Sequence, residues 1–391
     1  MEDHSDGYQV RSFADRPGIV HHDNVTVQRE PYHPEPIRRF RPLPTPLGPA
    51  PYHLSLAETL PSDRIEQIHS SGHIVFHSVG DTGGVEAPEA QIIVMKHMDQ
   101  DFVGADPSTQ PAFLYHLGDV AYYYGEASQY YAQFYEPAAY YPAPIFAIPG
   151  NHDGDVFNEA VPTLTAFLHN FCAPTPQHNK EAGDALRDAM TQPNVYWTLE
   201  APYVTIIGLY TNVPDGGMFD ENQLAWLESE LTEAPKDKAL FLAMHNPVYS
   251  ADGYHHGSTY LTGVLDSAIE RTGRVPDMFL AGHVHNYQRF TRSWKDREIP
   301  YLVVGTGGFW QLYALPKISG EKIKTPFAIP NTDVTLESYC DDRHGYLRLD
   351  VSEQVLKADF MSVPRPHEAW SAPAVVHDSF TLDLRNHRLL R

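Results

Sequence analysis

The stretch Tyr115-His116-Leu117-Gly118-Asp119-Val120-Ala121-Tyr122 closes an apolar run that begins at residue 112. The run has the length and composition of a buried strand, and it ends at Gly118, so that Asp119 lies just past the strand end. Tyr122 adds a phenol a few residues later. In open α/β sheets, ligands bind at the carboxyl ends of strands, because several loops converge there. Taken alone, however, this stretch is better explained by a turn aspartate.

The same arrangement, an apolar run followed by a side chain that can bind metals, occurs in four more loops, and five such loops in order are hard to attribute to chance. The candidates in the other loops are Asp81; Asn151, His152 and Asp153; His245; and His283 and His285. Glycines precede Asp81, Asp119, Asn151 and His283, and they permit tight turns and close backbone approach. Two ions held about 3.5–4 Å apart need a bridging carboxylate, further oxygen and imidazole ligands, and open positions for water and substrate. Alternation in His283-Val284-His285 would point both imidazoles the same way, so that one strand end reaches both ions.

The composition is that of a globular chain, with 391 residues, 42% hydrophobic content and 12% aromatic content. Such a chain can bury a large core in one or two domains. The formal net charge of −22 argues against a general nucleic-acid or acidic-membrane surface. An anionic substrate would therefore need concentrated local positive charge, which bound metal ions can supply.

Neither a membrane span nor an export signal is evident in the sequence. No apolar run reaches the length of a span, and the N-terminus lacks a basic region followed by an apolar one. Arg38-Arg39 is not followed by an apolar core. If Met1 is the natural start, we expect a cytoplasmic protein. Two cysteines, Cys172 and Cys340, are too few for a disulfide framework and are expected to be buried free thiols.

Residues 1–55 differ from the rest of the chain, because prolines crowd positions 31–51. We expect this Pro-rich N-terminal extension to be extended, packed along the surface or partly disordered. Residues 56–391 form the main domain. Helices are predicted at 88–102, 161–171, 220–231 and 261–271, and strands at 72–79, 112–117, 144–149, 194–199, 203–209, 238–244, 278–281, 301–304, 345–351 and 355–361, with a last one within 376–391. The sum is an α/β fold, a two-sheet mixed β-sandwich with helices outside.

Over roughly residues 72–310, the chain resembles the calcineurin-like metallophosphoesterases and, among them, the purple acid phosphatase branch. The motifs are Asp81-Thr-Gly83, Gly118-Asp-Val-Ala-Tyr122, Gly150-Asn-His-Asp153, Met244-His-Asn-Pro247 and Gly282-His-Val-His285-Asn-Tyr-Gln-Arg289. Many relatives have a histidine two residues after the first aspartate, where this chain has Gly83. Tyr122 is the mark of the purple branch, in which tyrosinate replaces that histidine and suits a ferric ion. The resemblance implies an αββα sandwich.

The resemblance also implies a role for each matching position. An Fe(III) ion would be bound by Asp81, Asp119, Tyr122 and His285. A divalent zinc, manganese or iron ion would be bound by Asp119, Asn151, His245 and His283. His152 would hydrogen-bond the substrate phosphate or protonate the leaving oxygen. His255 and His256 resemble a histidine pair that reaches the phosphate, and an exposed loop pair is the other interpretation.

Four features depart from the family pattern. Tyr124 stands where many plant members have an aspartate that helps to orient the histidine equivalent to His152. Gln288 replaces a glutamate that is frequent in the family, and we expect at most an indirect effect on the metal ligands. The amino-terminal fibronectin-like domain of plant members has no counterpart in residues 1–55, and the secretory signal typical of well-known members is not seen.

These features predict a binuclear-metal phosphoesterase that hydrolyses small phosphorylated substrates by attack of metal-activated water, in the manner of a purple acid phosphatase-like phosphomonoesterase. A phosphodiesterase or nucleotide pyrophosphatase on the same metal site is the alternative enzyme. An aromatic pocket for a base would then comprise Tyr249, Tyr254, Phe309 and Trp310, although core or rim packing is the commoner role of such residues. A non-catalytic metal-binding scaffold is the alternative of a different class. The sequence leaves the oligomeric state open.

Overall fold

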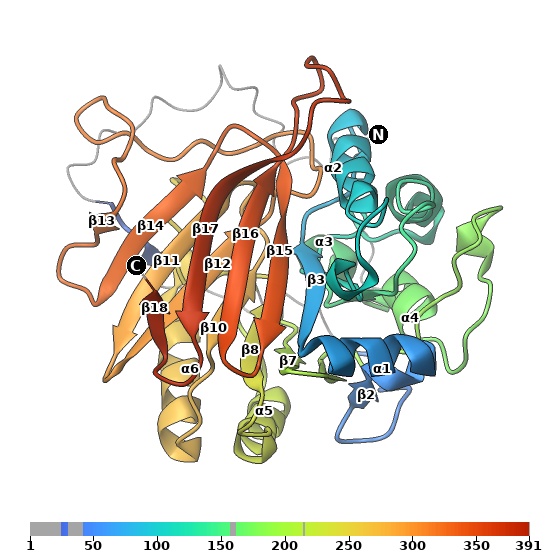
Figure 1. Cartoon of the computed structure of the whole chain (residues 1–391), viewed down its shortest axis with the longest axis horizontal. Helices are drawn as coiled ribbons and strands as arrows, with labels where there is room; N and C mark the ends of the chain where they lie inside the picture. Colours follow the sequence, from blue (N-terminus) through green and yellow to red (C-terminus); the bar gives the residue numbers. More distant parts are fainter. Residues whose placement is uncertain (1–24, 30–41, 157–161, 214–215, 391) are drawn as a thin grey trace.

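Two mixed β-sheets pack face to face in the computed structural model, with helices on the outer sides of the sandwich (Figure 1). The structure describes residues 25–29, 42–156, 162–213 and 216–390. This architecture confirms the predicted α/β fold, a two-sheet mixed β-sandwich flanked by helices. Within the described ranges, none of the helices has both the length and the apolar character needed to span a bilayer. Cys172 and Cys340 are buried free thiols, as expected.

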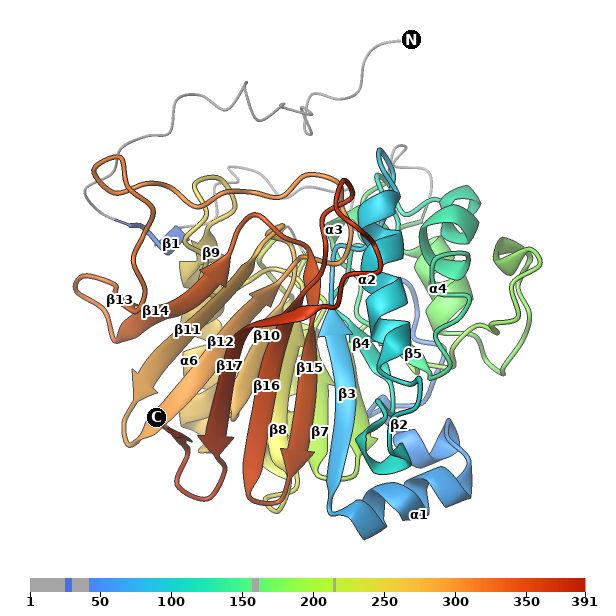
Figure 2. The same ribbon diagram turned by 45° about the horizontal axis from the view of Figure 1, so that its top comes forward.

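The seven-stranded sheet has the order β18-β17-β16-β15-β3-β4-β5. Its parallel part comprises β3 (His73–Val79), β4 (Leu114–His116) and β5 (Ile145–Ala147). Its antiparallel part comprises β15 (Gly345–Ser352), β16 (Val355–Ser362), β17 (Val375–Asp383) and β18 (Arg388–Leu390). Because β15 pairs with β3, the C-terminal strands complete the sheet that begins near the start of the main domain (Figure 2).

The nine-stranded sheet has the order β13-β14-β11-β12-β10-β8-β7-β6-β2. Its parallel centre comprises β7 (Val204–Gly208), β8 (Ala239–Met244), β10 (Met278–Ala281) and β12 (Arg297–Val304). The flanking strands are β2 (His53–Ser55), β6 (Trp197–Ala201), β11 (Tyr287–Trp294), β13 (Phe327–Ala328) and β14 (Val334–Cys340). Strands β6 and β7, which correspond to the strands predicted at 194–199 and 203–209, pair antiparallel.

Helices lie along the outer sides of the sandwich, whereas β16 and β17 retain exposed residues (Figure 1). The helices are α1 (Ser62–Ser71), α2 (Glu89–Gln100), α3 (Asn151–Gly154), α4 (Thr165–Phe171), α5 (Glu221–Glu233) and α6 (Thr259–Thr272), with the short turns η3 (Leu56–Glu58), η4 (Pro107–Thr109), η5 (Ala127–Gln129), η6 (Tyr131–Tyr135) and η7 (Lys180–Ala182). Strand β8 shows how the two cores divide. Phe241 and Ala243 join the core between the sheets, whereas Leu240 and Leu242 join the core that includes residues of α5 and α6. This division follows from the two-residue period of a strand.

Asp220, with Gln223 three residues later, has the sequence of a capping box at the start of α5. Asp220 Oδ1 accepts a hydrogen bond from the Gln223 backbone N–H at 3.1 Å, as an N-cap aspartate should. The Gln223 side chain does not complete the box. Its amide instead bonds both backbone groups of Tyr210, at 2.8 Å and 2.9 Å. The same side chain therefore joins α5 to the end of β7.

Strand β11 was not predicted, although it is an interior strand of the nine-stranded sheet, between β14 and β12. Arg289 and Arg292 interrupt its apolar pattern, yet both side chains are largely buried. Each has a carboxylate partner, at 2.7 Å between Arg289 and Asp378 and at 2.7 Å between Arg292 and Asp266. The buried charges are thus paired by residues distant in sequence, which the local pattern could not reveal.

The described parts of the Pro-rich extension pack against the main domain. Strand β2 is an edge strand parallel to β6, and β1 (Gln28–Arg29) pairs in parallel with β9 (Gly257–Ser258). These segments have the extended conformation that was expected. The boundary between residues 55 and 56 stays a prediction. Residues 1–24 and 30–41 of the extension lie outside the described residues.

Candidate metal centre

The candidate ligands follow five parallel strands drawn from both sheets. Three loops leave the carboxyl ends of β3, β4 and β5, and two leave the ends of β8 and β10. Backbone hydrogen bonds join these loops directly. The Asp81 N–H donates to Gly118 O at 2.9 Å, and the Gly282 N–H donates to His245 O at 3.0 Å. The sandwich therefore brings the five loops to one edge, where ligands collect in α/β folds.

Asp81, Tyr122 and His285 bring three polar atoms together. The Tyr122 hydroxyl lies 3.3 Å from Asp81 Oδ1 and 3.3 Å from His285 Nε2. The His285 nitrogen lies 3.4 Å from the same Asp81 oxygen. All three side chains are buried. Two oxygens and one imidazole nitrogen make an oxygen-rich donor set that suits a hard cation.

Asp119, Asn151, His245 and His283 form the second group. His245 Nε2 lies 3.2 Å from Asp119 Oδ2 and 3.1 Å from Asn151 Oδ1. His283 Nδ1 lies 3.0 Å from the same Asn151 oxygen. Asp119, His245 and His283 each offer one ligand atom, and these atoms lie within 4.8 Å of one another. Two imidazole nitrogens and two oxygens suit a divalent ion such as zinc, manganese or iron.

Hydrogen bonds from ring nitrogens to backbone carbonyls orient two of the imidazoles. His245 Nδ1 lies 2.8 Å from Leu117 O, and His285 Nδ1 lies 3.2 Å from Gln311 O. With Nδ1 protonated, Nε2 of each ring is free to act as a ligand, which is the usual arrangement in metal sites. Sequence reasoning did not find these partners, because every residue carries a carbonyl and only the fold selects one.

Two glycines allow the Asp119 and Asn151 loops to meet. Gly118 has φ +94°, and a Cβ there would lie 2.6 Å from Gly150 N and 2.7 Å from His245 Nδ1. A Cβ on Gly150 would lie 2.1 Å from Asp119 Oδ1. Any larger residue would push the ligand side chains apart. The close backbone approach predicted for these glycines is confirmed.

Asp153, which the sequence analysis included in a motif without a separate role, holds two ligand loops together. Its carboxylate accepts hydrogen bonds from Gly150 N at 2.9 Å, Val120 N at 3.0 Å and Ala121 N at 3.2 Å. Burial and the nearby Asp119 charge raise the pKa of Asp153 to about 7, although the backbone donors act in the opposite direction. Its position three residues after Gly150 at a helix start was the signal that could have assigned this role.

The charges of the second group balance one another. Burial opposes the charged form of His245, yet the Asp119 carboxylate beside it raises the pKa of His245 to about 9. Burial and the neighbouring His245 hold the pKa of His283 well below its ordinary value. The Asp119 carboxylate thus favours the protonated form of His245. A metal ion would displace that proton, which is how metal binding couples to pH.

His152 lies beside both groups and is oriented by a backbone carbonyl. Its Nδ1 lies 2.8 Å from Tyr123 O, and its Nε2 lies 4.0 Å from Asp119 Oδ2. Its own backbone N–H donates to Asp119 Oδ1 at 2.8 Å. Burial lowers the pKa of His152, although the Asp119 charge opposes this shift. The carbonyl of Tyr123 thus orients the ring in a chain that has Tyr124 in place of the aspartate of plant relatives.

His255 and His256 lie on different sides of their loop. The His255 ring lies 5.2 Å from the His283 ring, at an interplanar angle of 90°, and its side chain is 30% exposed. Burial and the charge of Arg29 lower the pKa of His256. The structure therefore brings His255 to the edge of the centre, whereas His256 lies toward residues 25–29.

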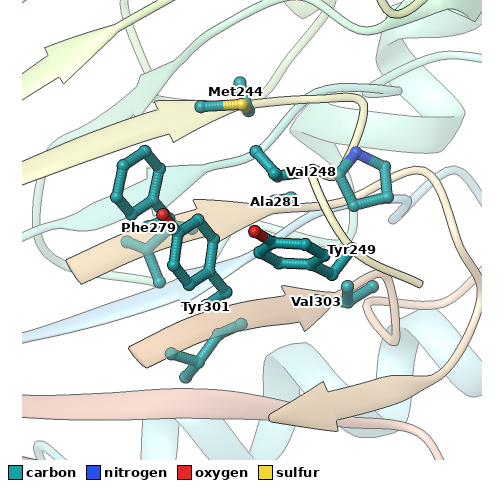
Figure 3. Close-up of a pocket in the computed structure, with 10 residues that line it drawn as sticks. Met244, Val248, Tyr249, Phe279, Ala281, Tyr301 and Val303 are labelled. Atoms are coloured by element: carbon teal, nitrogen blue, oxygen red, sulfur yellow. The ribbon is translucent and has the colours of Figure 1, made fainter. Parts of the chain in front are cut away.

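Of the four aromatic residues considered as a base pocket, two pack against other side chains. Tyr249 packs in the core, with its ring 4.9 Å from the Tyr301 ring, and it lines a cavity of about 10 Å³ (Figure 3). A cavity of that size holds about one water molecule. Phe309 packs 4.5 Å from the Tyr122 ring and 4.3 Å from the His285 ring, while Tyr254 is exposed. Tyr249 and Phe309 therefore have the packing role that was the alternative interpretation of the sequence.

Three comparisons relate this chain to known proteins. Residues 76–287 match the family model described as calcineurin-like phosphoesterase. The Arabidopsis thaliana protein named "Probable purple acid phosphatase 20" is 25% identical over 214 residues, which are 52% of this chain and 44% of that protein. A 3′,5′-cyclic adenosine monophosphate phosphodiesterase of Escherichia coli (strain K12) is 28% identical over 183 residues, which are 46% of this chain and 56% of that protein.

The fold has a matching solved structure. Purple acid phosphatase PPD1 from yellow lupin (Lupinus luteus) superposes with a TM-score of 0.57 at 18% identity, over 81% of this chain and 55% of that one. The matches thus span less than two thirds of the length of each of these relatives. Because the family model covers more than half of the sequence, the chain belongs to the calcineurin-like phosphoesterase family, and within it the chain is purple acid phosphatase-like.

Proposed function

We propose that this protein is a binuclear-metal phosphoesterase that hydrolyses phosphate monoesters. The observation that carries the proposal is the pair of adjacent, largely buried donor sets at the strand ends. One is oxygen-rich, with Asp81, Tyr122 and His285, and the other has two imidazoles. Family membership supports the reaction class. Monoester preference, the use of two ions and the metal pair are our inferences.

In this proposal, Asp81, Asp119, Tyr122 and His285 hold Fe(III), and Asp119, Asn151, His245 and His283 hold a divalent zinc, manganese or iron ion. Asp119 would serve both ions, since its carboxylate lies 3.2 Å from His245 and its charge acts on Tyr122. The ions would supply concentrated positive charge for the phosphate oxygens and lower the pKa of a water nucleophile.

The chain's own residues bind and orient the ester. With Nδ1 held by the Tyr123 carbonyl, His152 can use Nε2 to donate to a phosphoryl oxygen, or to give a proton to the leaving oxygen, when the ring is an imidazolium. Burial disfavours that charged form. An anionic phosphate close to the ring would favour it, so substrate binding and protonation of His152 support each other.

His255 is the second residue that we expect to contact phosphate. Its ring is adjacent to His283 and partly exposed, so a bound phosphate could reach it from solvent. His256 is not included as a direct contact, because it lies toward residues 25–29. This revises the histidine pair of the sequence analysis to a single histidine in our proposal.

Replacement of Asp119 tests the proposal. Asp119→Ala removes the proposed bridge, so metal content measured by mass spectrometry should fall below one ion per chain and phosphomonoester hydrolysis should fall at least about 10³-fold. Asp106→Ala is the matched control, because Asp106 is an exposed cap of η4. Full metal content and activity in Asp119→Ala would contradict the proposal.

A phosphodiesterase on the same site is the second candidate, and the named activity of the Escherichia coli relative favours it. The two candidates differ in the charge and bulk of the preferred ester. A panel of monoesters, diesters and cyclic nucleotides separates them by relative kcat/KM. Faster turnover of diesters than of monoesters would favour the second candidate. Metal-replete protein that cleaves no ester in the panel would favour a non-catalytic scaffold.

A further inference from the structure

We propose that residues 25–29, here called the N-terminal strap, position His255 for phosphate binding, and that Gln28 is the positioning residue. The inference rests on the proposed function, since it concerns the phosphate-contacting side of the same centre. The strap lies far from the ligands in sequence. It pairs through β1 with β9, which forms the end of the loop of residues 248–258, here called the His255 loop.

The strap bonds both ends of the His255 loop through its backbone. Val27 O accepts hydrogen bonds from Ser250 N at 3.0 Å and from Gly257 N at 3.2 Å. The loop ends also meet each other, since the Ser258 N–H donates to Val248 O at 3.2 Å. One carbonyl of the strap therefore holds together the two ends of the loop that carries His255.

The Gln28 side chain reinforces this closure. Its amide Nε2 lies 2.9 Å from Val248 O and 3.3 Å from Ser258 O, and it also contacts the Thr262 hydroxyl on α6. These acceptors belong to the first and last residues of the loop and to the helix that follows it. The carboxamide nitrogen carries two N–H donors, which these three acceptors share, and alanine offers neither donor.

Apolar burial fixes the strap in place. Val25 and Val27 are 7% and 5% exposed and belong to the core that contains residues of α6. Side chains of a strand alternate, so Gln28 points to the other side of the strap, toward the loop ends. The strap is thus attached by apolar burial in addition to the hydrogen bonds that it makes to the loop.

Inside the loop, further hydrogen bonds fix the backbone at and near His255. Asp252 Oδ1 accepts from Tyr254 N at 2.8 Å and from His255 N at 2.7 Å. The Ala251 N–H donates to Gln288 Oε1 at 2.7 Å, which ties the other side of the loop to β11. His255 therefore lies between two supports, the strap and Gln288, and removal of either support should let its ring move away from His283.

Gln28→Ala tests this inference by two measurements. Hydrogen exchange of the metal-free protein should become faster at the amides of residues 250–257 and remain unchanged at β3 and β4. Titration calorimetry of the metal-loaded protein with inorganic phosphate should show a dissociation constant raised about 3- to 10-fold, with unchanged metal content. Gln110→Ala is the matched control, because the Gln110 amide also bonds two backbone carbonyls, outside the strap and the loop.

A double-mutant cycle separates positioning from general destabilisation. If Gln28 acts through His255, Gln28→Ala should weaken phosphate binding in the unmodified protein but not further in His255→Ala. Equal effects in both backgrounds, or unchanged exchange of residues 250–257 in Gln28→Ala, would overturn the inference. If the unmodified protein hydrolyses no ester, the proposed function fails, whereas the exchange measurement still decides whether the strap holds the loop.

Discussion

Three candidate ligands have backbone conformations that residues other than glycine rarely adopt. Asp81, Asp119 and His283 have φ angles of +59°, +54° and +69°. A left-handed residue costs about 1 kcal/mol or more, and the surrounding structure must hold it. Here the cost falls on the residues whose side chains form the two donor sets. At the scale of single residues, the chain is therefore built to direct these side chains inward, against its own backbone preference.

Tyr122 is the residue whose replacement tests the iron assignment most directly. Its ring packs 4.5 Å from Phe309 and 4.4 Å from His152, so Tyr122→Phe keeps the packing and removes only the hydroxyl. Burial and the nearby carboxylates raise the pKa of Tyr122 well above its ordinary value, so the phenolate forms only beside a strong cation. We expect the protein to be coloured as purified with iron and Tyr122→Phe to lack that visible absorption band.

Tyr287→Phe is the control for this comparison. The Tyr287 hydroxyl also donates to a carboxylate, Asp378 at 2.7 Å, from a buried position outside the centre. The Tyr287→Phe variant should lose about 1 kcal/mol in the free energy of unfolding and keep the visible absorption band. A colourless unmodified protein with full metal content and activity would remove the iron assignment and leave the phosphoesterase proposal in place.

Asp153→Asn tests whether the Asp153 carboxylate holds the Asp119 and Asn151 loops together. The substitution keeps the shape of the side chain but replaces one acceptor oxygen by an amide donor, which faces backbone N–H groups. We expect a loss of about 1–3 kcal/mol in the free energy of unfolding, measured by denaturant titration of the metal-free protein. A loss below about 0.5 kcal/mol would show that the carboxylate is replaceable.

At the scale of elements, His53 joins three of them at the edge of the nine-stranded sheet. It lies on β2, and its ring nitrogens lie 2.8 Å from Glu200 on β6 and 2.7 Å from Glu230 on α5. The hydrogen bond with Glu230 raises the pKa of His53 above 6.5, although burial opposes the shift. An edge strand this short has few backbone bonds, so these side-chain contacts carry much of its attachment.

The His53 contacts predict a stability that depends on pH. Because the pKa is raised in the folded state, the charged ring stabilises the fold fully below the unfolded pKa of about 6.5, and this contribution is lost as pH rises through the folded pKa. His53→Gln should therefore cost about 0.5–1 kcal/mol more at low pH than above the folded pKa, a figure reduced for partial exposure. Urea titrations at both pH values measure the difference. An equal cost at both would contradict the assignment.

At the scale of the whole molecule, local patterns predicted the fold class and the five ligand loops, because strands with apolar runs and ligands at their ends are visible in short windows. The pairing partners were not visible. Arg289 in β11 needs Asp378 from β17, and the strap needs a loop more than 200 residues away. Likewise, the carbonyls that orient His152, His245 and His285 have no side-chain signature. What the sequence could not reveal is therefore mainly what depends on contacts between distant segments.

The net charge of −22 predicts how ionic strength affects the proposed reaction. A doubly charged monoester approaches a strongly acidic molecule, and the repulsion acts over about 30 Å at 0.01 M salt but only about 10 Å at 0.1 M. Raising the salt over that range should therefore increase kcat/KM for a monoester dianion, by about two- to fivefold. A singly charged diester of the same leaving group is the control and should respond less. Initial rates in sodium chloride measure both. A kcat/KM for the monoester that falls as salt is added would mean that the positive charge at the metal centre, and not the acidic surface, governs encounter.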